Sequence, residues 1–214
     1  MQVLNKRYLN KNYITAGFRK YTSEHFPIQS AELNALMIGR LRELFAENAD
    51  ADPKKMYHLK EQILPAIAVY EALQPVMSIE EACAVIHQMT AAHARKSRLM
   101  IQKLLVIPGL YRLVPTIFAI FTHKSFNEQA GFSANEHQTT GGVWRIDMTR
   151  CPYHDMCGQY NYPELCTCFC DSDDIAYESL HPKIVWQRTG TLGRGDECCD
   201  FCLKLADAPL KEDR

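Results

Sequence analysis

The chain has 214 residues, of which 47% are hydrophobic and 23% charged, values typical of a globular protein with a sizeable core. Its formal net charge of −1 gives no preference for nucleic acid or an acidic membrane surface, so we expect neither as a partner. The N-terminal residues lack the apolar segment of a secretory signal. With nine cysteines and no such signal, we expect reduced thiols in the cytoplasm and not a disulfide framework.

Helical patterns dominate residues 1–125, which we predict to form a helical scaffold. Residues 1–29 are polar and irregular, and they predict one short helix or an arm. After Pro27 apolar residues recur at helical spacing, with Ser30 as the predicted N-cap of the first clear helix. Its predicted apolar stripe consists of Leu33, Leu36, Met37, Leu41, Leu44 and Phe45.

Two further helix starts are marked by capping residues. Asp52 followed by Pro53 is typical of a first helical turn, and Pro65 predicts a kink farther along that helix. Ser78 and Glu81 have the spacing of a capping box, which predicts another long helix. The residues expected to face the core are Leu59, Ile63, Ala66, Ile67 and Tyr70 in the first helix and Ala82, Val85, Ile86 and Met89 in the second.

Residues 104–121 form a long apolar stretch. Its length approaches that of a membrane-spanning helix, but Pro108, Pro115 and the charge of Arg112 oppose a span. We therefore predict a buried helix that is broken near the two prolines, and no membrane partner. The alternative is that the stretch is an interface, which would make the protein a homo-oligomer.

The periodicity changes after residues 126–142, which are polar and aperiodic and predict a connecting loop. In residues 143–150, Trp144, Ile146 and Met148 alternate with polar residues, which predicts a half-buried strand.

A helix is predicted to begin at Pro163 and to end before Pro182. Residues 183–192 and 197–205 then predict two strands joined by a tight turn. Helices followed by a strand–helix–hairpin unit indicate an α+β fold with an antiparallel sheet. We expect the cysteine-rich α+β part, residues 143–214, to form one compact unit with the helices.

Residues 150–202 contain eight of the nine cysteines, so we expect the chemistry of the protein in this part. On the predicted helix, Cys166, Cys170 and Asp173 share one face because residues four apart align, while Cys168 points away. The helix dipole favours a thiolate at Cys166, whereas the acidic residues that follow oppose ionisation of Cys170. Packing as small buried side chains is the alternative for both cysteines.

Zinc binding requires paired ligands at short spacing. The cysteines and the histidine of residues 151–157 and the cysteines of residues 198–202 have compatible spacings, but they do not form two matched pairs. We therefore expect no metal or other cofactor, and we assign a structural zinc to the alternative function, a non-catalytic small-ligand-binding or sensor module. A thiol-redox protein is a further alternative, although a C-x-x-C motif in a thioredoxin-like setting is missing.

Several residues near the predicted strand ends are candidates for binding a substrate. An arginine at a strand end can bind a carboxylate through two hydrogen bonds, and each candidate has a solvated surface position as its alternative. The predicted substrate-binding residues are Arg150, Cys151, Arg188, Thr191 and Cys199.

Six segments in this order resemble one family. They are LPAIAVYEAL (64–73), SIEEA (78–82), RCPY (150–153), PEL (163–165), FCDSD (169–173) and TGTLGRGDECCDF (189–201). Together they resemble the L-2-amino-thiazoline-4-carboxylic acid hydrolase family. The resemblance implies a helical part followed by an α+β part, and hydrolytic opening of a cyclic amidine-like thiazoline to a carbamoyl-cysteine. A fainter similarity links the C-terminal end to vinyl-reductase-like small-ligand domains, whose metal-ligand pattern is not reproduced.

The resemblance suggests a catalytic hypothesis with Cys170 and Asp173 as catalytic residues. The ring carbon bonded to two nitrogens and a sulfur is electrophilic, and a Cys170 thiolate could attack it while Asp173 pairs with the amidinium. Arg150 or Arg188 would bind the substrate carboxylate. In the alternative mechanism Asp173 activates water, and Cys170 only lines the pocket.

Overall fold

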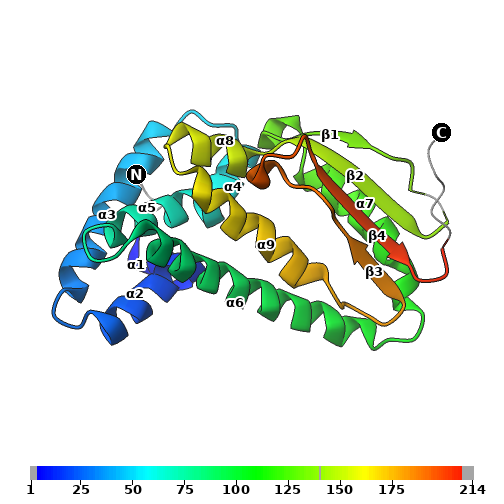
Figure 1. The fold of residues 1–214 in the computed structure, drawn as a ribbon, viewed down its shortest axis with the longest axis horizontal. Coiled ribbons are helices and arrows are strands. Elements are labelled where there is room, and N and C mark those ends of the chain that lie inside the picture. The colour runs from blue at the N-terminus through cyan, green and yellow to red at the C-terminus, as the bar shows by residue number, and fades with distance from the viewer. Residues whose placement is uncertain (1–3, 140, 209–214) are drawn as a thin grey trace.

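The computed structural model describes residues 4–139 and 141–208. The ends of the predicted ranges 1–125 and 143–214, and residue 140 of the predicted loop, lie outside the described residues. The fold is α+β, as predicted: an N-terminal helical part precedes a four-stranded antiparallel sheet (Figure 1).

The helical part contains α-helices and shorter 3₁₀ or π segments, the latter labelled η. In chain order the helical elements are α1 (Lys6–Lys11), α2 (Tyr13–His25), α3 (Ser30–Glu47), α4 (Pro53–His58), η1 (Leu59–Ile63), α5 (Leu64–Leu73), α6 (Ile79–Leu105), η2 (Leu110–Leu113), α7 (Val114–Ser125), η3 (Glu128–Ala130), α8 (Pro152–Gln159), η4 (Pro163–Leu165), α9 (Cys166–Tyr177) and η5 (Leu192–Arg194). The strands are β1 (Ser133–Glu136), β2 (Val143–Arg150), β3 (Ile184–Gln187) and β4 (Cys199–Leu205).

Two helices, α1 and α2, replace the single short helix or arm predicted for residues 1–29, so that prediction was wrong. The signal that was missed is a pair of asparagine caps. Asn5 caps α1, and Asn12 caps α2 by accepting hydrogen bonds from the backbone of Ile14 and Thr15, each at 3.1 Å. The Asn12 side chain is buried, and its amide donates to the carbonyl of Glu61 at 2.8 Å.

The kink predicted at Pro65 takes the form of the π-helical turn η1 directly before α5. Proline has no backbone N–H, so the carbonyl of Glu61, four residues earlier, lacks its usual helical partner. Asn12 supplies the missing donor, and Tyr8 donates to the neighbouring carbonyl of Lys60 at 2.6 Å. The N-terminal helices therefore stabilise the irregular turn.

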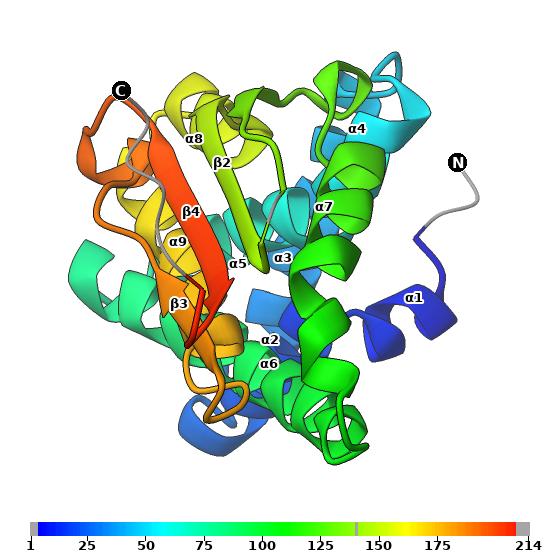
Figure 2. The same ribbon diagram turned by 90° about the vertical axis from the view of Figure 1, so that its right-hand side faces the viewer.

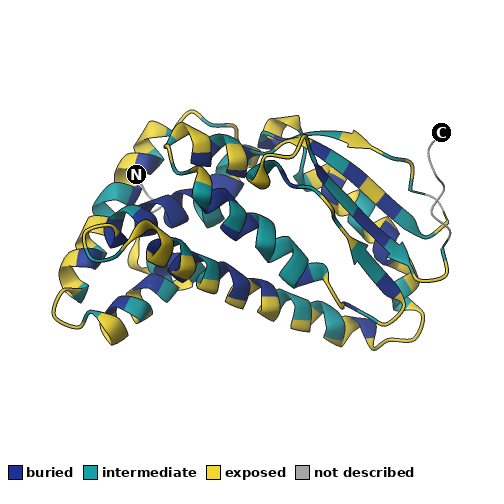
Figure 3. Ribbon diagram, in the orientation of Figure 1, coloured by how far each residue is buried: buried dark blue, intermediate teal, exposed yellow. Residues whose placement is uncertain are grey.

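The predicted caps at Asp52 and Ser78 are confirmed, and Ser78 with Glu81 forms a complete capping box at the start of α6. Ser30 is not an N-cap, because Gln29 holds that position without a side-chain hydrogen bond. Helix α5 is buried on nearly all sides, and Figure 3 shows it largely in the colour of buried residues. It is the centre of a cluster of buried residues that also includes side chains from the sheet.

The sheet has the strand order β1-β2-β4-β3, and all neighbours are antiparallel. Strand β1 and η3 lie within residues 126–142, so the prediction of a loop there was wrong. The four residues of β1 are small or polar and lack the alternation that marks a half-buried strand, as is common at a sheet edge.

The predicted pairing of the last two strands is confirmed, but the tight turn between them was wrong. Strand β3 already ends at Gln187, and residues 188–198 form a long connection that contains η5. The carboxylate of Asp200 accepts hydrogen bonds from the backbone of Thr189 at 2.8 Å and of Gly190 at 2.7 Å. These N–H groups are thereby unavailable to the sheet, and the strand stops early.

One face of the sheet is apolar and turned towards helices. Trp144, Ile146 and Met148 of β2 are buried, as predicted, and they pair with Leu203, Phe201 and Cys199 of β4. Helices α7 and α9 lie over this face (Figure 2). Helix α9 in turn packs along the length of α6 (Figure 1).

The prediction of a buried broken helix in residues 104–121 was half right. The chain does break, at residues 106–109 between α6 and η2, but most large apolar side chains of the stretch are exposed. No single helix in the described residues has the length and hydropathy to cross a membrane. By length and composition alone, residues 79–105 and 110–125 pass that test as a pair, although they are bent by 119°.

We predict that Asn12→Ala lowers the free energy of unfolding by about 2–3 kcal/mol, because it removes a helix cap and leaves the partly buried Glu61 carbonyl without its side-chain donor. Asn5→Ala, which removes an exposed cap alone, should cost less than about 1 kcal/mol. Urea unfolding of both variants tests this, and equal losses would contradict the role given to Asn12 at η1.

Candidate active site

A cavity of about 600 Å³ opens between α9, the inner face of the sheet, and the segment formed by α4 and η1. A smaller apolar recess of about 60 Å³ under α7 shares several of its walls. Aromatic and polar residues both contribute to the lining. The lining residues are Lys54, Tyr57, His58, Gln62, Phe121, Lys124, Ser125, Phe126, Phe132, Met148, Cys151, Tyr153, Phe169, Cys170, Ser172, Asp173, Tyr177, Arg188, Cys199 and Phe201.

Helix α9 presents the two residues predicted to be catalytic, Cys170 and Asp173, to this cavity. The predicted shared face of Cys166 and Cys170 is confirmed by a distance of 4.0 Å between their sulfur atoms. Cys168 lies on the opposite side of the helix, where its thiol contacts the carbonyl of Cys83 on α6 at 3.6 Å. Cys166 is buried behind Cys170 and does not line the cavity.

The guanidinium of Arg188 crosses from the end of β3 to α9. Its side chain is only 3% exposed, and it donates to the carbonyl of Cys170 at 3.0 Å and to the carboxylate of Asp174. It also lies over the ring of Phe201. Its Nη1 atom is 3.7 Å from Asp173, beyond a hydrogen bond, and is one of three buried side-chain atoms in the described residues without a hydrogen-bond partner. One donor of a buried cation is therefore left without a hydrogen bond, next to Asp173.

Asp173 lines both the cavity and the apolar recess, and 41% of its side-chain surface is accessible. Burial raises the pKa of Asp173 to about 7. Arg188 opposes this rise, and the negative charge of Asp174 adds to it. A carboxyl group that changes its charge near neutral pH is suited to general acid–base catalysis.

The thiols around the cavity are held in the protonated form. The contact with Cys166, followed by burial, raises the pKa of Cys170 far above that of a free thiol. Burial raises the pKa of Cys151 strongly and that of Cys199 to about 11. The pKa of Cys166 is also raised, first through its contact with Cys157. None of these four cysteines has the low pKa that marks an activated nucleophile.

Five of the seven predicted site residues line the cavity: Cys151, Cys170, Asp173, Arg188 and Cys199. The other two lie elsewhere. Arg150 has a largely exposed side chain that pairs with Asp155 at 2.7 Å. Thr191 is buried at the start of η5, on the long connection instead of on a strand, and does not line the cavity.

Sequence reasoning missed two polar residues of the cavity wall, His58 and Tyr153. The ring of His58 is buried, with Nε2 donating to the carbonyl of Ser125 at 3.2 Å. Nδ1 is then free to accept from the Tyr153 hydroxyl, also at 3.2 Å. Burial lowers the pKa of His58, so the ring is neutral. These residues lie 95 positions apart, and local spacing gives no signal for the pair.

A zinc site is not formed by the described side chains. Across residues 4–139 and 141–208, no group of three or more His, Cys, Asp or Glu residues has an arrangement that could hold a metal ion. The predicted ligand-like spacing of residues 151–157 instead belongs to helix α8, which begins at Pro152.

Comparison with known proteins gives one family match. Residues 56–203 match the family described as L-2-amino-thiazoline-4-carboxylic acid hydrolase. The matched region includes the cavity from its α4 wall at Tyr57 to Phe201 on β4, but not Lys54. A search of curated proteins found no match.

The backbone of η5 packs directly on the thiols of α9 at Gly193. A Cβ atom at this position would lie 2.9 Å from the Cys170 sulfur and 3.0 Å from the Cys166 sulfur, closer than real contacts allow. Residue 193 must therefore be glycine for η5 to seat against the helix. Gly158 differs, because a Cβ atom there would have no neighbour within 4 Å.

We predict that Gly193→Ala destabilises the protein by about 1–3 kcal/mol, as overpacking of a core does, and disturbs the cavity through Cys170. Gly158→Ala, inside α8, should be neutral or stabilising by up to about 1 kcal/mol. Thermal unfolding of the two variants compares them, and an unchanged Tm for Gly193→Ala would show that the thiol contact is not tight.

Proposed function

The chain belongs to the L-2-amino-thiazoline-4-carboxylic acid hydrolase family, and we propose that it hydrolyses 2-amino-thiazoline-4-carboxylate or a close cyclic amidine relative. The observation that carries the proposal is that Asp173 and Arg188 line the same cavity, with one donor of Arg188 left without a hydrogen bond. The substrate carries a carboxylate and a basic amidine on a small flat ring. The cavity offers a group of matching type to each.

The substrate would be bound by charge at one end and by stacking in the middle. The carboxylate accepts a hydrogen bond from Nη1 of Arg188, which has no such partner in the described residues. The flat ring lies among aromatic side chains such as Phe169, Tyr177 and Phe201. The amidine nitrogens are then close to Asp173. Arg150 takes no part in this arrangement, because its guanidinium pairs with Asp155.

The preferred mechanism is direct attack by water. Asp173 in its ionised form removes a proton from a water molecule, and the oxygen adds to the ring carbon between the two nitrogens and the sulfur. The electron pair of the C=N bond moves to the nitrogen, which is already protonated in the amidinium form of the substrate. The carbon–sulfur bond then breaks as the added hydroxyl becomes the urea carbonyl and releases its proton to solvent, and the sulfur takes a proton from Asp173. The product is a carbamoyl-cysteine with a free thiol, and Asp173 is returned to its starting state.

The covalent mechanism with Cys170 as nucleophile is the second choice. It requires a thiolate, and the contact with Cys166 together with burial holds the pKa of Cys170 far above neutral. Its nearest charged neighbours do not remove this obstacle, because the guanidinium of Arg188 is already bound to Asp174. We therefore assign Cys170 to the wall of the pocket.

The alternative function, a ligand-binding or sensor module with a structural zinc, has less support. Its zinc would need three or more clustered ligands, which the described residues do not form. Metal analysis of the purified protein tests it directly, since about one zinc per chain would favour the module.

The decisive test is incubation of the purified protein with the thiazoline acid and assay of the product thiol. If Asp173 is the base, kcat/KM should be flat above pH about 7 and fall tenfold per pH unit below it, because protonation removes the base. Asp173→Asn should lower kcat by about a hundredfold or more and abolish this acidic limb.

A matched control is Asp171→Asn, since Asp171 lies on the same helix but outside the cavity, where it pairs with Arg194. It should retain the wild-type pH profile. An acidic limb that persists in Asp173→Asn would show that another group is the base.

We predict that Cys170→Ala keeps turnover close to the wild type, because water and Asp173 perform the chemistry. Cys166→Ala, next to it on α9 but outside the cavity, is the control for packing effects. Steady-state kinetics decide the point. Loss of nearly all turnover in Cys170→Ala alone would establish the covalent mechanism instead.

A further inference from the structure

One end of the molecule exposes a concentration of large apolar side chains. Of the thirteen large hydrophobic residues that are exposed in the described chain, nine fall between residues 99 and 121. They are Leu99, Met100, Leu104, Val106, Ile107, Leu113, Ile117, Ile120 and Phe121. Soluble domains rarely leave so many large aliphatic groups together in water, and such a surface usually marks an interaction site.

The turn between α6 and α7 gives this surface its shape. The two helical segments meet at 119°, and Gly109, with a φ of 81°, allows the reversal. Residues 106–109 form the tip of this turn, and Val106 there is 79% exposed. Leu113 at the end of η2 and Ile117 and Ile120 on the outer side of α7 recur at helical spacing and form one exposed stripe.

The opposite side of α7 packs against the rest of the protein. Phe118 packs against Trp144 of the sheet with ring centroids 5.3 Å apart, and Val114 and Pro115 are buried. Figure 2 shows α7 running along the side of the molecule, next to the sheet. The outer stripe is therefore an additional apolar face, which the packing of the chain does not require.

The charge around this surface has one dominant sign. Residues 82–127 contain six Lys or Arg residues and no Asp or Glu, whereas the rest of the chain has a formal net charge of −7. The six are Arg95, Lys96, Arg98, Lys103, Arg112 and Lys124. The near-zero net charge of the whole chain thus conceals a basic, apolar segment.

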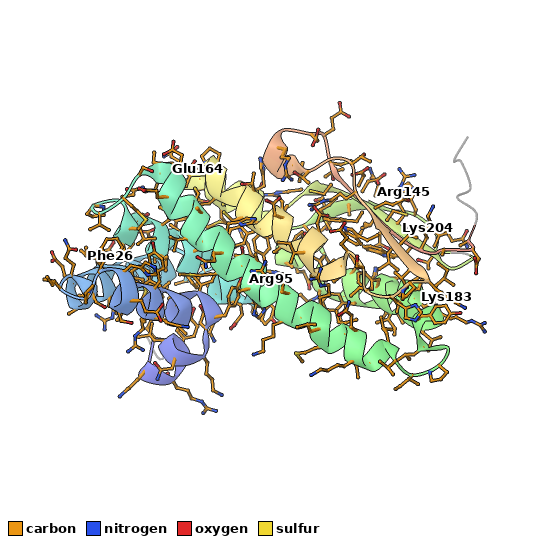
Figure 4. All side chains as sticks on the ribbon, turned by 60° about the horizontal axis from the view of Figure 1, so that its bottom comes forward. Phe26, Arg95, Arg145, Glu164, Lys183 and Lys204 are labelled. Carbon is orange, nitrogen blue, oxygen red and sulfur yellow. The ribbon has the colours of Figure 1, made fainter. Side chains whose placement is uncertain are left out.

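A tyrosine in η2, next to residues 106–109, has two cations beside its ring. The ring of Tyr111 stacks on His181 at 4.7 Å, with Lys183 at 5.4 Å and Arg112 at 5.8 Å from its centroid. Figure 4 labels Lys183 beside this end and Arg95 farther back on α6. Tyrosine with lysine and arginine is typical of residues at the level of lipid headgroups.

Two acidic residues lie near the two ends of this surface. Glu178 is exposed next to Ser179, whose carbonyl accepts from Gln102 of α6 at 2.9 Å. At the other end of α7, Glu136 pairs with His123 at 3.2 Å. These two carboxylates do not balance the six basic residues.

We propose that the tip at residues 106–109 and the outer stripe of α7 dock on the surface of a membrane that contains anionic phospholipid. The aliphatic side chains enter the boundary of the acyl chains, and the surrounding lysines and arginines contact lipid phosphates. A second copy of the chain fits less well, because a symmetric contact through this surface would bring the two basic margins together.

The contact is peripheral and does not span the bilayer. A helix of the length of α7, 12 residues, is about 18 Å long, well short of the roughly 30 Å hydrocarbon core. Its inner side also stays on the sheet. The proposal replaces the expectation of no membrane partner, which depended on burial of residues 104–121 and on the net charge of the whole chain.

Cosedimentation of the full chain with phosphatidylcholine vesicles, with and without phosphatidylserine, tests this inference. We expect binding to the phosphatidylserine vesicles that weakens with added salt. The double variant Ile117→Ser/Ile120→Ser should bind about tenfold more weakly or worse. The matched control is Ile28→Ser, since Ile28 is 96% exposed but lies between α2 and α3, and it should bind as the wild type does.

Charge is tested in the same assay with Lys103→Glu, which should weaken binding by about tenfold, against Lys6→Glu on α1, which should not. All substituted residues are exposed, so circular dichroism and Tm should stay unchanged. The proposal fails if the wild type binds neither kind of vesicle, binds both equally, or loses binding equally in the controls. It also fails if the wild type is a dimer that the isoleucine double variant converts to a monomer without any vesicle binding.

Discussion

The guanidinium of Arg188 is the contact on which the geometry of the site depends. It is almost fully buried, and such a cation is stable only when its donors find partners. Asp174 and the carbonyl of Cys170 supply them, so the arginine fastens α9 to the end of β3. Trp186 occupies the other oxygen of Asp174 at 2.8 Å. With Asp174 fully engaged, Asp173 is left beside the cation but without a hydrogen bond to it.

The two neighbouring carboxylates of α9 have different roles. Asp174 is structural, whereas Asp173 faces an aromatic cavity that disfavours its charge. The same low polarity acts on the cysteines, whose thiols it keeps protonated. These pKa directions support the proposed carboxylate base over a sulfur nucleophile, even though the surrounding sequence is rich in cysteine.

Much of the fold could be predicted because its signals are local. The capping box at Ser78, the Asp52 cap and the alternation in β2 depend on residues within one turn or one strand, and each was read correctly. The misses depend on contacts between distant residues. Strand β1 exists because β2 offers it an edge, and β3 ends early because the side chain of Asp200 takes its backbone donors.

In the candidate site, too, the local arrangement could be predicted and the contacts between distant residues could not. Helical spacing placed Cys166, Cys170 and Asp173 on one face, and the sulfur distance agrees. The pairing of His58 with Tyr153 joins α4 to α8 across 95 positions, and the position of Arg150 outside the cavity follows from a surface ion pair. Local patterns carry no information on such distances.

The π-helical turn η1 links the orientation of His58 in the cavity wall to the packing of the core. A π turn holds about one residue more than an α turn. Compared with a continuous α-helix, the side chains before the turn are therefore rotated by about 100° relative to those after it. His58 stands before the turn and the buried helix α5 after it. Tyr8 and Asn12 donate to the carbonyls of Lys60 and Glu61 inside this turn, so its geometry ties the direction of His58 to the docking of the N-terminal helices. One wall of the cavity therefore depends on contacts that lie outside the cavity.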